Sequence, residues 1–209
     1  SPAGGKRDYA HDMNTVTSQA RLSAASLKSK HDAGLSYQDY LATDATKAPR
    51  WREKEELLVL TDEQRRLIGR FVRPMRVLCI SGIWCGDCVA QGPMLHVIAS
   101  GNPQVIDLKF VDRDEHIDLA EAVRINDGLR VPTVIWMAED FEPVSILGDR
   151  TLTRYRAIAA RQLGPSCPLP GAHIPQDELN ATMQEWLDEF ERVHLLLRLS
   201  ARLREKHGD

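Results

Sequence analysis

The stretch VLCISGIWCGDCVAQGPML, residues 77–95, contains two cysteines, Cys85 and Cys88, separated by two residues. An apolar run precedes the pair, as in a strand that is buried on both faces, and a helical pattern follows it as far as Gly101. The pair therefore lies where a strand ends and a helix begins. The spacing alone allows three interpretations: a redox couple, half of a metal site, or two unrelated thiols.

The position of the pair favours the redox interpretation. The first turn of a helix has unpaired amide groups and the positive end of the helix dipole, and both stabilise an anion. We therefore expect the pKa of Cys85 to be lowered, as a nucleophile requires. Cys88, one turn into the helix, lies close enough to attack a mixed disulfide on Cys85. Trp84 would shield the site and offer an apolar contact to a partner.

A zinc or iron–sulfur site would need two further ligands at suitable spacing. Cys79 lies within the preceding strand, where we expect it to point into the core, and Cys167 is far away in a proline-rich loop. We therefore expect no bound metal. We interpret Cys79 as an inert core cysteine and Cys167 as a loop cysteine; a third redox thiol and a regulatory thiol are the respective alternatives.

The rest of the chain alternates between strand and helix patterns. Besides residues 75–81, the expected strands are residues 56–60 and 104–112 and a hairpin of residues 131–138 and 143–148. The expected helices are residues 17–34, 36–44, 61–71, 88–100, 115–125, 152–164 and 176–206. Thr61 and Gln64 form a capping-box pattern at the start of one of them. This order predicts an α/β fold with a central mixed β-sheet flanked by helices.

The length of 209 residues predicts one domain with extensions. We divide it into a polar, partly helical N-terminal extension (1–54), a domain (55–163), and a proline-rich loop with an amphipathic helix packed on the domain (164–209). The apolar stripe of that helix is Leu179, Met183, Trp186, Leu187, Phe190, Val193 and Leu197. A dimer interface is the alternative use of this stripe, and we expect a monomer.

The quoted stretch resembles the active-site segment of the thioredoxin family. It has the apolar strand, the Trp-Cys-x-x-Cys motif, and a helix with a proline, Pro93, five residues after the second cysteine. The family's second motif, an apolar residue before Pro-Thr at the start of a strand, appears at residues 131–133, and Gly148 matches a glycine late in the following strand. The resemblance covers residues 55–163. It implies a thioredoxin fold, with a helical N-terminal arm and a long C-terminal helix outside it.

The resemblance also implies a role for each matching residue. Cys85 would be the attacking thiolate and Cys88 the resolving thiol. Pro132 would be cis and face the pair, and Val131 would offer backbone groups to an extended substrate segment. The expected substrate-binding residues are Trp84, Gly86, Val131 and Pro132.

Two positions depart from the family pattern. Thioredoxins usually carry a buried acid six residues before the first cysteine, thought to accept the proton of the resolving thiol, and here that position is Cys79. The second residue between the cysteines is usually proline, and here it is Asp87. We expect the Asp87 carboxylate to raise the pKa of Cys85 relative to a neutral residue. Asp87 is also our third catalytic candidate, as a proton acceptor for Cys88, although it could be a helix-start acid only.

The resemblance implies a thiol–disulfide oxidoreductase that exchanges a Cys85–Cys88 dithiol or disulfide with protein disulfides and uses no bound cofactor. Its partners would be protein disulfide substrates and a reducing or oxidising redox partner. A thioredoxin-fold protein-binding module with vestigial or regulatory redox activity is the alternative. A peroxidase or glutathione-linked enzyme fits less well, because peroxidatic members usually place Thr or Pro ahead of a single cysteine.

The composition excludes several other classes of protein. Apolar residues make up 43% of the chain and charged residues 27%, with a net charge of -3, which is typical of a soluble protein with a core. There is no basic run with interleaved aromatic residues, so we expect no nucleic-acid partner. No apolar run approaches the ~20 residues that span a bilayer. The few cysteines favour the cytoplasm, or the periplasm or secretion if a signal peptide has been removed.

Overall fold

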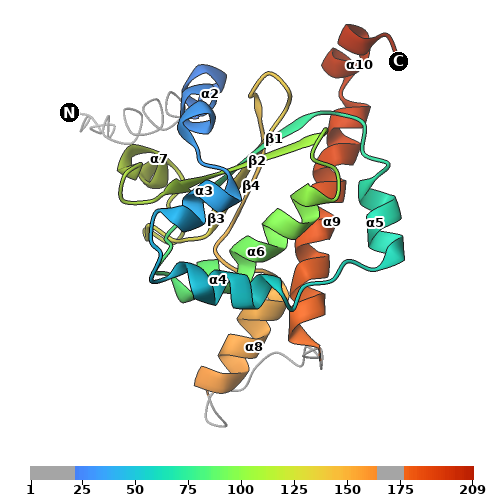
Figure 1. Ribbon diagram of the computed structural model, residues 1–209. Helices are drawn as coiled ribbons and strands as arrows, with labels where there is room; N and C mark the ends of the chain where they lie inside the picture. Colours follow the sequence, from blue (N-terminus) through green and yellow to red (C-terminus); the bar gives the residue numbers. More distant parts are fainter. Residues whose placement is uncertain (1–21, 164–176) are drawn as a thin grey trace, which may run out of the picture.

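The computed structural model describes residues 22–163 and 177–209 (Figure 1). The early part of the first expected helix, the proline-rich loop, Gly164 and Cys167 lie outside the described residues. The four strands are β1 (Met75–Ser81), β2 (Ile106–Asp112), β3 (Thr133–Met137) and β4 (Pro143–Gly148). They are ordered β2-β1-β3-β4, with β1 parallel to β2 and the other two pairs antiparallel. The expected mixed sheet, including the β3–β4 hairpin, is confirmed.

Helices cover this sheet and extend beyond its edges (Figure 1). They are α2 (Ala24–Ala33), α3 (Tyr37–Ala42), α4 (Ala48–Glu55), α5 (Asp62–Ile68), α6 (Gly86–Ser100), α7 (Ile117–Ala122), α8 (Leu152–Gln162), α9 (Glu178–Leu199) and α10 (Ala201–His207). Local sequence signals set several of their starts. The Thr61 hydroxyl accepts a hydrogen bond from Gln64 N, and Gln64 Oε1 accepts one from Thr61 N, so the capping box is confirmed.

The strand expected at residues 56–60 is not formed. The segment follows α4 and pairs with none of the four strands. Leu58 and Leu60 are buried, whereas Leu57 and Val59 are exposed, so the segment shows the alternation of a strand. Leu58 and Leu60 help to cover the core, but no strand pairs with the segment to supply the backbone hydrogen bonds of a sheet.

The expected single helix at residues 176–206 is two helices. Ser200 has an extended backbone (φ -64°, ψ 115°), which interrupts the hydrogen-bond ladder between α9 and α10. Six of the seven residues of the apolar stripe on α9 are buried in the core, and the seventh, Leu179, is partly buried against it.

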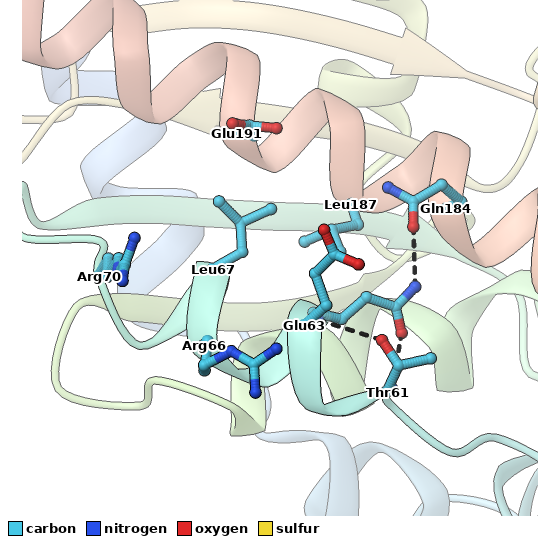
Figure 2. A pocket seen from close by; sticks show the side chains of 9 residues that line it. Thr61, Glu63, Arg66, Leu67, Arg70, Gln184, Leu187 and Glu191 are labelled. Atoms are coloured by element: carbon cyan, nitrogen blue, oxygen red, sulfur yellow. Dashed lines mark hydrogen bonds between the residues drawn. The ribbon is translucent and has the colours of Figure 1, made fainter.

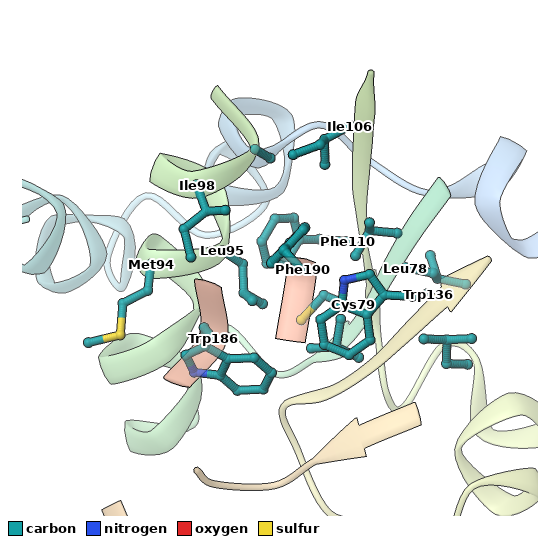
Figure 3. Packing of buried hydrophobic residues seen from close by; sticks show 14 of the residues in the cluster. Leu78, Cys79, Met94, Leu95, Ile98, Ile106, Phe110, Trp136, Trp186 and Phe190 are labelled. Carbon is teal, nitrogen blue, oxygen red and sulfur yellow. The ribbon is translucent and has the colours of Figure 1, made fainter. Parts of the chain in front are cut away.

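One face of the sheet packs on α6 and α9. Because side chains alternate along a strand, Cys79 of β1 shares a face with Phe110 of β2, its register partner. Trp136 of β3 lies with its ring centroid 6.1 Å from that of Trp186 and 5.5 Å from that of Phe190, both on α9. Figure 3 shows these side chains gathered between the sheet, α6 and α9. The opposite face is covered in part by α2.

The helices before β1 also contribute to this core. Tyr40 of α3 stacks on Phe110 at 5.3 Å, and Trp51 of α4 is fully buried. The Trp51 indole N–H donates a hydrogen bond of 3.0 Å to the carbonyl of Ile83, just before the cysteine pair. A Cβ atom at Gly92 of α6 would lie 2.2 Å from the Trp51 ring. Glycine at this position therefore allows α4 to pack closely on α6. No helix in the described part of the chain is both long and apolar enough to cross a membrane.

Candidate active site at the cysteine pair

The cysteine pair lies at the start of α6, as expected from the sequence. Cys85 is the N-cap residue of the helix and is partly exposed, while Cys88 sits one turn further and is fully buried. The backbone N–H of Gly82 donates to the Cys88 sulfur at 3.4 Å, which holds this thiol against the end of β1. Both residues are free thiols in the structure.

The two thiols differ in acidity. The pKa of Cys85 is lowered to about 6, chiefly because the Cys88 thiol donates a hydrogen bond to its sulfur. The backbone N–H groups of Cys88 and Asp87 add to this effect, as expected at a helix N-terminus, while partial burial and the Asp87 charge oppose it. Burial raises the pKa of Cys88 well above its usual range, so this thiol keeps its proton at neutral pH.

Cys79 lies in the core, as expected. Its side chain is completely buried in β1, and burial raises the pKa of its thiol. A neutral, inaccessible thiol at this position has the properties of a packing residue.

The segment around Pro132 faces the partly exposed thiol of Cys85. The Val131–Pro132 peptide bond is cis, as the family resemblance implied. The Cys85 thiol donates a long hydrogen bond of 3.7 Å to the Val131 carbonyl. A Cβ atom at Gly148 would lie 2.6 Å from Thr133 Oγ1 and 2.9 Å from the Pro132 carbonyl oxygen. Glycine at this position lets β4 pass close to the start of β3, beside the cysteine pair.

The surface beside Cys85 is partly apolar. The Trp84 side chain is 43% exposed, and the Arg113 guanidinium lies over its ring at 4.7 Å. A Cβ atom at Gly82 would lie 2.7 Å from the Trp84 ring, so the indole rests directly on the Gly82 backbone. A Cβ atom added at Gly86 would meet no atom within 4 Å other than those of its chain neighbours and of the nearby helix backbone. The surface at Gly86 is therefore open.

Asp87 is paired with two arginines that the sequence analysis did not identify. One carboxylate oxygen lies 2.6 Å from Arg150 Nη2, and the other lies 2.9 Å from Arg154 Nη2. Partial burial would raise the pKa of Asp87, but the two guanidinium groups outweigh it and hold the pKa below its usual range. The sequence contained no signal for these pairs, because both arginines lie more than sixty residues from Asp87 along the chain.

The sequence analysis also did not identify two buried hydroxyl groups near Cys88, those of Ser81 and Tyr40. Ser81 is the last residue of β1 and is fully buried, and Tyr40 of α3 is 2% exposed. Neither hydroxyl has a hydrogen-bond partner among the residues that the structure describes. Neither residue is part of a sequence motif, and Tyr40 lies in a segment that was assigned to an extension.

A pocket of about 790 Å³ lies between α5 and α9, away from the cysteines (Figure 2). Its lining residues are Thr61, Glu63, Gln64, Arg66, Leu67, Arg70, Gln184, Leu187 and Glu191. A hydrogen bond of 2.8 Å between the side chains of Gln64 and Gln184 joins its two walls. Within residues 22–163 and 177–209, no group of three or more His, Cys, Asp or Glu side chains is placed to hold a metal ion.

Comparisons with known proteins identify the fold. A family profile described as Thioredoxin matches residues 34–158. A protein of unknown function from Pseudomonas aeruginosa is 18% identical over 81% of this chain and 95% of its own, with a TM-score of 0.58. An HIV epitope-scaffold is 18% identical over 83% of this chain and 98% of its own, with a TM-score of 0.54. No curated protein matches the sequence.

These similarities confirm the expected thioredoxin fold. The family match begins at residue 34, within the segment that we assigned to an N-terminal extension. The two structural similarities cover still more of the chain than the family match does. The division at residues 54 and 163 stays a prediction.

Proposed function

Because this chain belongs to the thioredoxin family, we propose that it is a thiol–disulfide oxidoreductase that acts on disulfides in partner proteins. The observation that carries the proposal is the contrast between its two thiols. Cys85 is partly exposed and has a pKa of about 6, whereas Cys88 is buried beside it and protonated. Cys85 is thus ionised and able to attack a disulfide at neutral pH, whereas Cys88 stays protonated until a mixed disulfide has formed.

The reaction proceeds in two exchanges. With a pKa of about 6, roughly nine-tenths of Cys85 is thiolate at pH 7. The thiolate attacks one sulfur of a partner's disulfide, and the partner's other sulfur leaves as a thiolate. Cys88 then loses its proton and attacks the Cys85 sulfur, which releases the partner and leaves a Cys85–Cys88 disulfide. A second redox partner restores the dithiol.

The surroundings of Cys85 supply a binding surface for the partner. The Val131 carbonyl, which lies 3.7 Å from the Cys85 sulfur, becomes free to accept a backbone N–H when that thiol is ionised. Pro132 follows it on the same side of the pair. The exposed Trp84 ring and the open surface at Gly86 leave room for the rest of an extended segment. We assign substrate binding to these four residues.

We assign Asp87 an electrostatic role. Its charge opposes the Cys85 thiolate and so disfavours the dithiol form, which makes the couple a better reductant. Because Arg150 and Arg154 occupy both of its carboxylate oxygens, it is a poor acceptor for the proton of Cys88. The two arginines also neutralise part of its effect on Cys85.

Reduction of insulin by dithiothreitol, followed as precipitation of the freed chains, tests this function. The wild-type protein should accelerate it, Cys85→Ser should abolish the acceleration, and Cys88→Ser should accumulate a mixed disulfide on Cys85. Cys79→Ala is the matched control, because it removes a thiol that is buried in the core. Equal activity of the wild-type protein and Cys85→Ser would exclude the proposed function and favour the binding-module alternative.

A further inference from the structure

Gln91 is a buried polar residue that takes no part in the two exchanges themselves. It lies on α6, three residues after Cys88, and its side chain is completely buried. An amide side chain can donate two hydrogen bonds and accept two, and burying it is costly unless these bonds are made. The Gln91 amide makes all four. Its partners therefore indicate which parts of the chain it holds in place.

Two of these partners lie on either side of Arg150. Gln91 Nε2 donates a hydrogen bond of 3.0 Å to the Asp149 carbonyl oxygen, and Gln91 Oε1 accepts one of 3.4 Å from the backbone N–H of Thr151. One side chain of α6 thus binds the backbone immediately before and immediately after Arg150. Because both neighbours of Arg150 are fixed, its own backbone can vary little. This arrangement sets the direction in which the Arg150 side chain leaves the chain.

The Arg150 side chain extends from this segment back to α6. Its Nη2 atom lies 2.6 Å from Asp87 Oδ2, and its Nη1 atom lies 3.4 Å from Asp149 Oδ2. The Asp149 carboxylate is buried and also binds Tyr155 and Arg130. Arg150 therefore reaches a residue that lies between the two cysteines, and it does so from a segment that is fixed on both sides.

The orientation of the Gln91 amide depends on α9. The indole N–H of Trp186 on α9 (Figure 3) donates a hydrogen bond of 3.2 Å to Gln91 Oε1. An indole N–H can only donate, so it requires the amide oxygen on its own side and leaves Nε2 facing the Asp149 carbonyl. Glu178–Leu199, the span of α9, lies beyond residue 158, where the family match ends. A helix outside the family match thus contributes to the surroundings of the cysteine pair.

We propose that Gln91 is a positioning residue for the disulfide exchange, because it holds Arg150 against Asp87. Trp186 of α9 in turn orients its amide. The proposal rests on the proposed function and adds to it a group that acts through others. The Asp87 carboxylate opposes the Cys85 thiolate, so a cation fixed on that carboxylate favours the thiolate. Gln91 thereby influences the reacting sulfur without being a catalytic residue.

Loss of the Gln91 amide should release Arg150 but not Arg154. Arg154 binds the other oxygen of Asp87 at 2.9 Å and is itself paired with Glu178 of α9 at 2.9 Å. Asp87 would then keep one of its two compensating charges, and its negative charge would act more strongly on the neighbouring thiolate. The pKa of that thiol should therefore rise, and the couple should become more reducing.

Titration of the thiolate absorbance in a Cys167→Ser background measures this effect without any substrate. Gln91→Met keeps the length of the side chain and removes its amide. It should raise the pKa of Cys85 by about half a unit to one unit, and Arg150→Met should raise it by at least as much. The double variant should match Arg150→Met, because both substitutions break the same connection. The redox equilibrium with glutathione should move in the reducing direction in all three variants.

Gln184→Met is the matched control. Gln184 also joins two helices through its side chain, with a hydrogen bond of 2.8 Å to Gln64 between α9 and α5, away from the cysteines. This substitution should leave the pKa of Cys85 unchanged, and a rise as large as that in Gln91→Met would overturn the proposal. An unchanged pKa in Gln91→Met would also overturn it. So would a rise in the Arg150→Met background as large as that in the wild-type background, since Gln91 would then act by another route.

Trp186→Phe decides the proposal if circular dichroism shows that Gln91→Met does not fold. It keeps an aromatic ring in the core and removes the indole N–H that orients the Gln91 amide. The pKa of Cys85 should rise in this variant but not when Arg150→Met is also present; no rise would overturn the proposal. Failure of the wild-type protein to accelerate insulin reduction would instead refute the disulfide-exchange function, because the titration does not depend on turnover.

Discussion

Replacing Cys88 with alanine should raise the pKa of Cys85 substantially. The hydrogen bond that the Cys88 thiol donates is the largest cause of the low pKa of Cys85, which is about 6. A hydrogen bond to a charged group contributes about 1.5–3 kcal/mol. Since one pKa unit corresponds to about 1.4 kcal/mol, its loss should raise the pKa by about 1–2 units, to between about 7 and 8.

The ultraviolet absorbance of the thiolate, titrated against pH in a Cys167→Ser background, measures this change. Cys79 does not interfere, because burial raises its pKa out of the working range. Cys88→Ser keeps a hydroxyl donor and should give a smaller rise than Cys88→Ala. A Cys88→Ala protein that still titrates near the wild-type value would refute the argument, since the helix N-terminus alone would then account for the low pKa.

The same pKa predicts how the stability of the reduced protein depends on pH. An unfolded cysteine titrates at about 8.5, above the value in the folded protein. The folded thiolate therefore adds stability that is fully present above pH about 8.5 and is lost as the pH falls through about 6. Urea unfolding should show a wild-type advantage over Cys85→Ala at alkaline pH that disappears at about pH 5. A constant difference across this range would contradict the assignment.

Three further substitutions, with one control substitution, test the charges, the packing and the helix capping. Asp87→Asn should lower the pKa of Cys85 and make the couple more oxidising in equilibrium with glutathione; unchanged values would remove the electrostatic role. Gly92→Ala should destabilise the protein by about 1–3 kcal/mol, because its Cβ atom would lie 2.2 Å from the Trp51 ring. Gly86→Ala is its control, with open space around the added methyl group, and should leave the melting temperature almost unchanged. Thr61→Ala should cost about 1 kcal/mol in urea unfolding, and no loss would show that the capping box is dispensable.

The features that the sequence predicted correctly are those with local causes. The start of α6 at the cysteine pair follows from the change of apolar period in that segment. The capping box at Thr61 depends on residues three positions apart. The β3–β4 hairpin follows from two apolar runs separated by a short polar turn. In each case the chain contains, within a few residues, most of the interactions that form the element.

The features that the sequence did not predict depend on contacts between distant segments. Residues 56–60 have the pattern of a strand, but a strand also needs a neighbour, and none lies beside them. Asp87 is paired with arginines more than sixty residues away in sequence. Tyr40 lies in a polar segment, and only the folded chain stacks its ring on Phe110 of β2. Patterns within one segment carry no information about such partners.

The close packing of Trp51 on Gly92 restricts how this protein can evolve. A larger residue at position 92 collides with the indole, so it is tolerated only after Trp51 has been replaced by a smaller side chain. Loss of Trp51, however, removes the donor to the Ile83 carbonyl and loosens the segment that leads into the cysteine pair. Substitution of Gly92 alone or of Trp51 alone should therefore destabilise the protein, whichever of the two comes first. Homologues should show the two positions changing together, with glycine retained wherever the tryptophan is present.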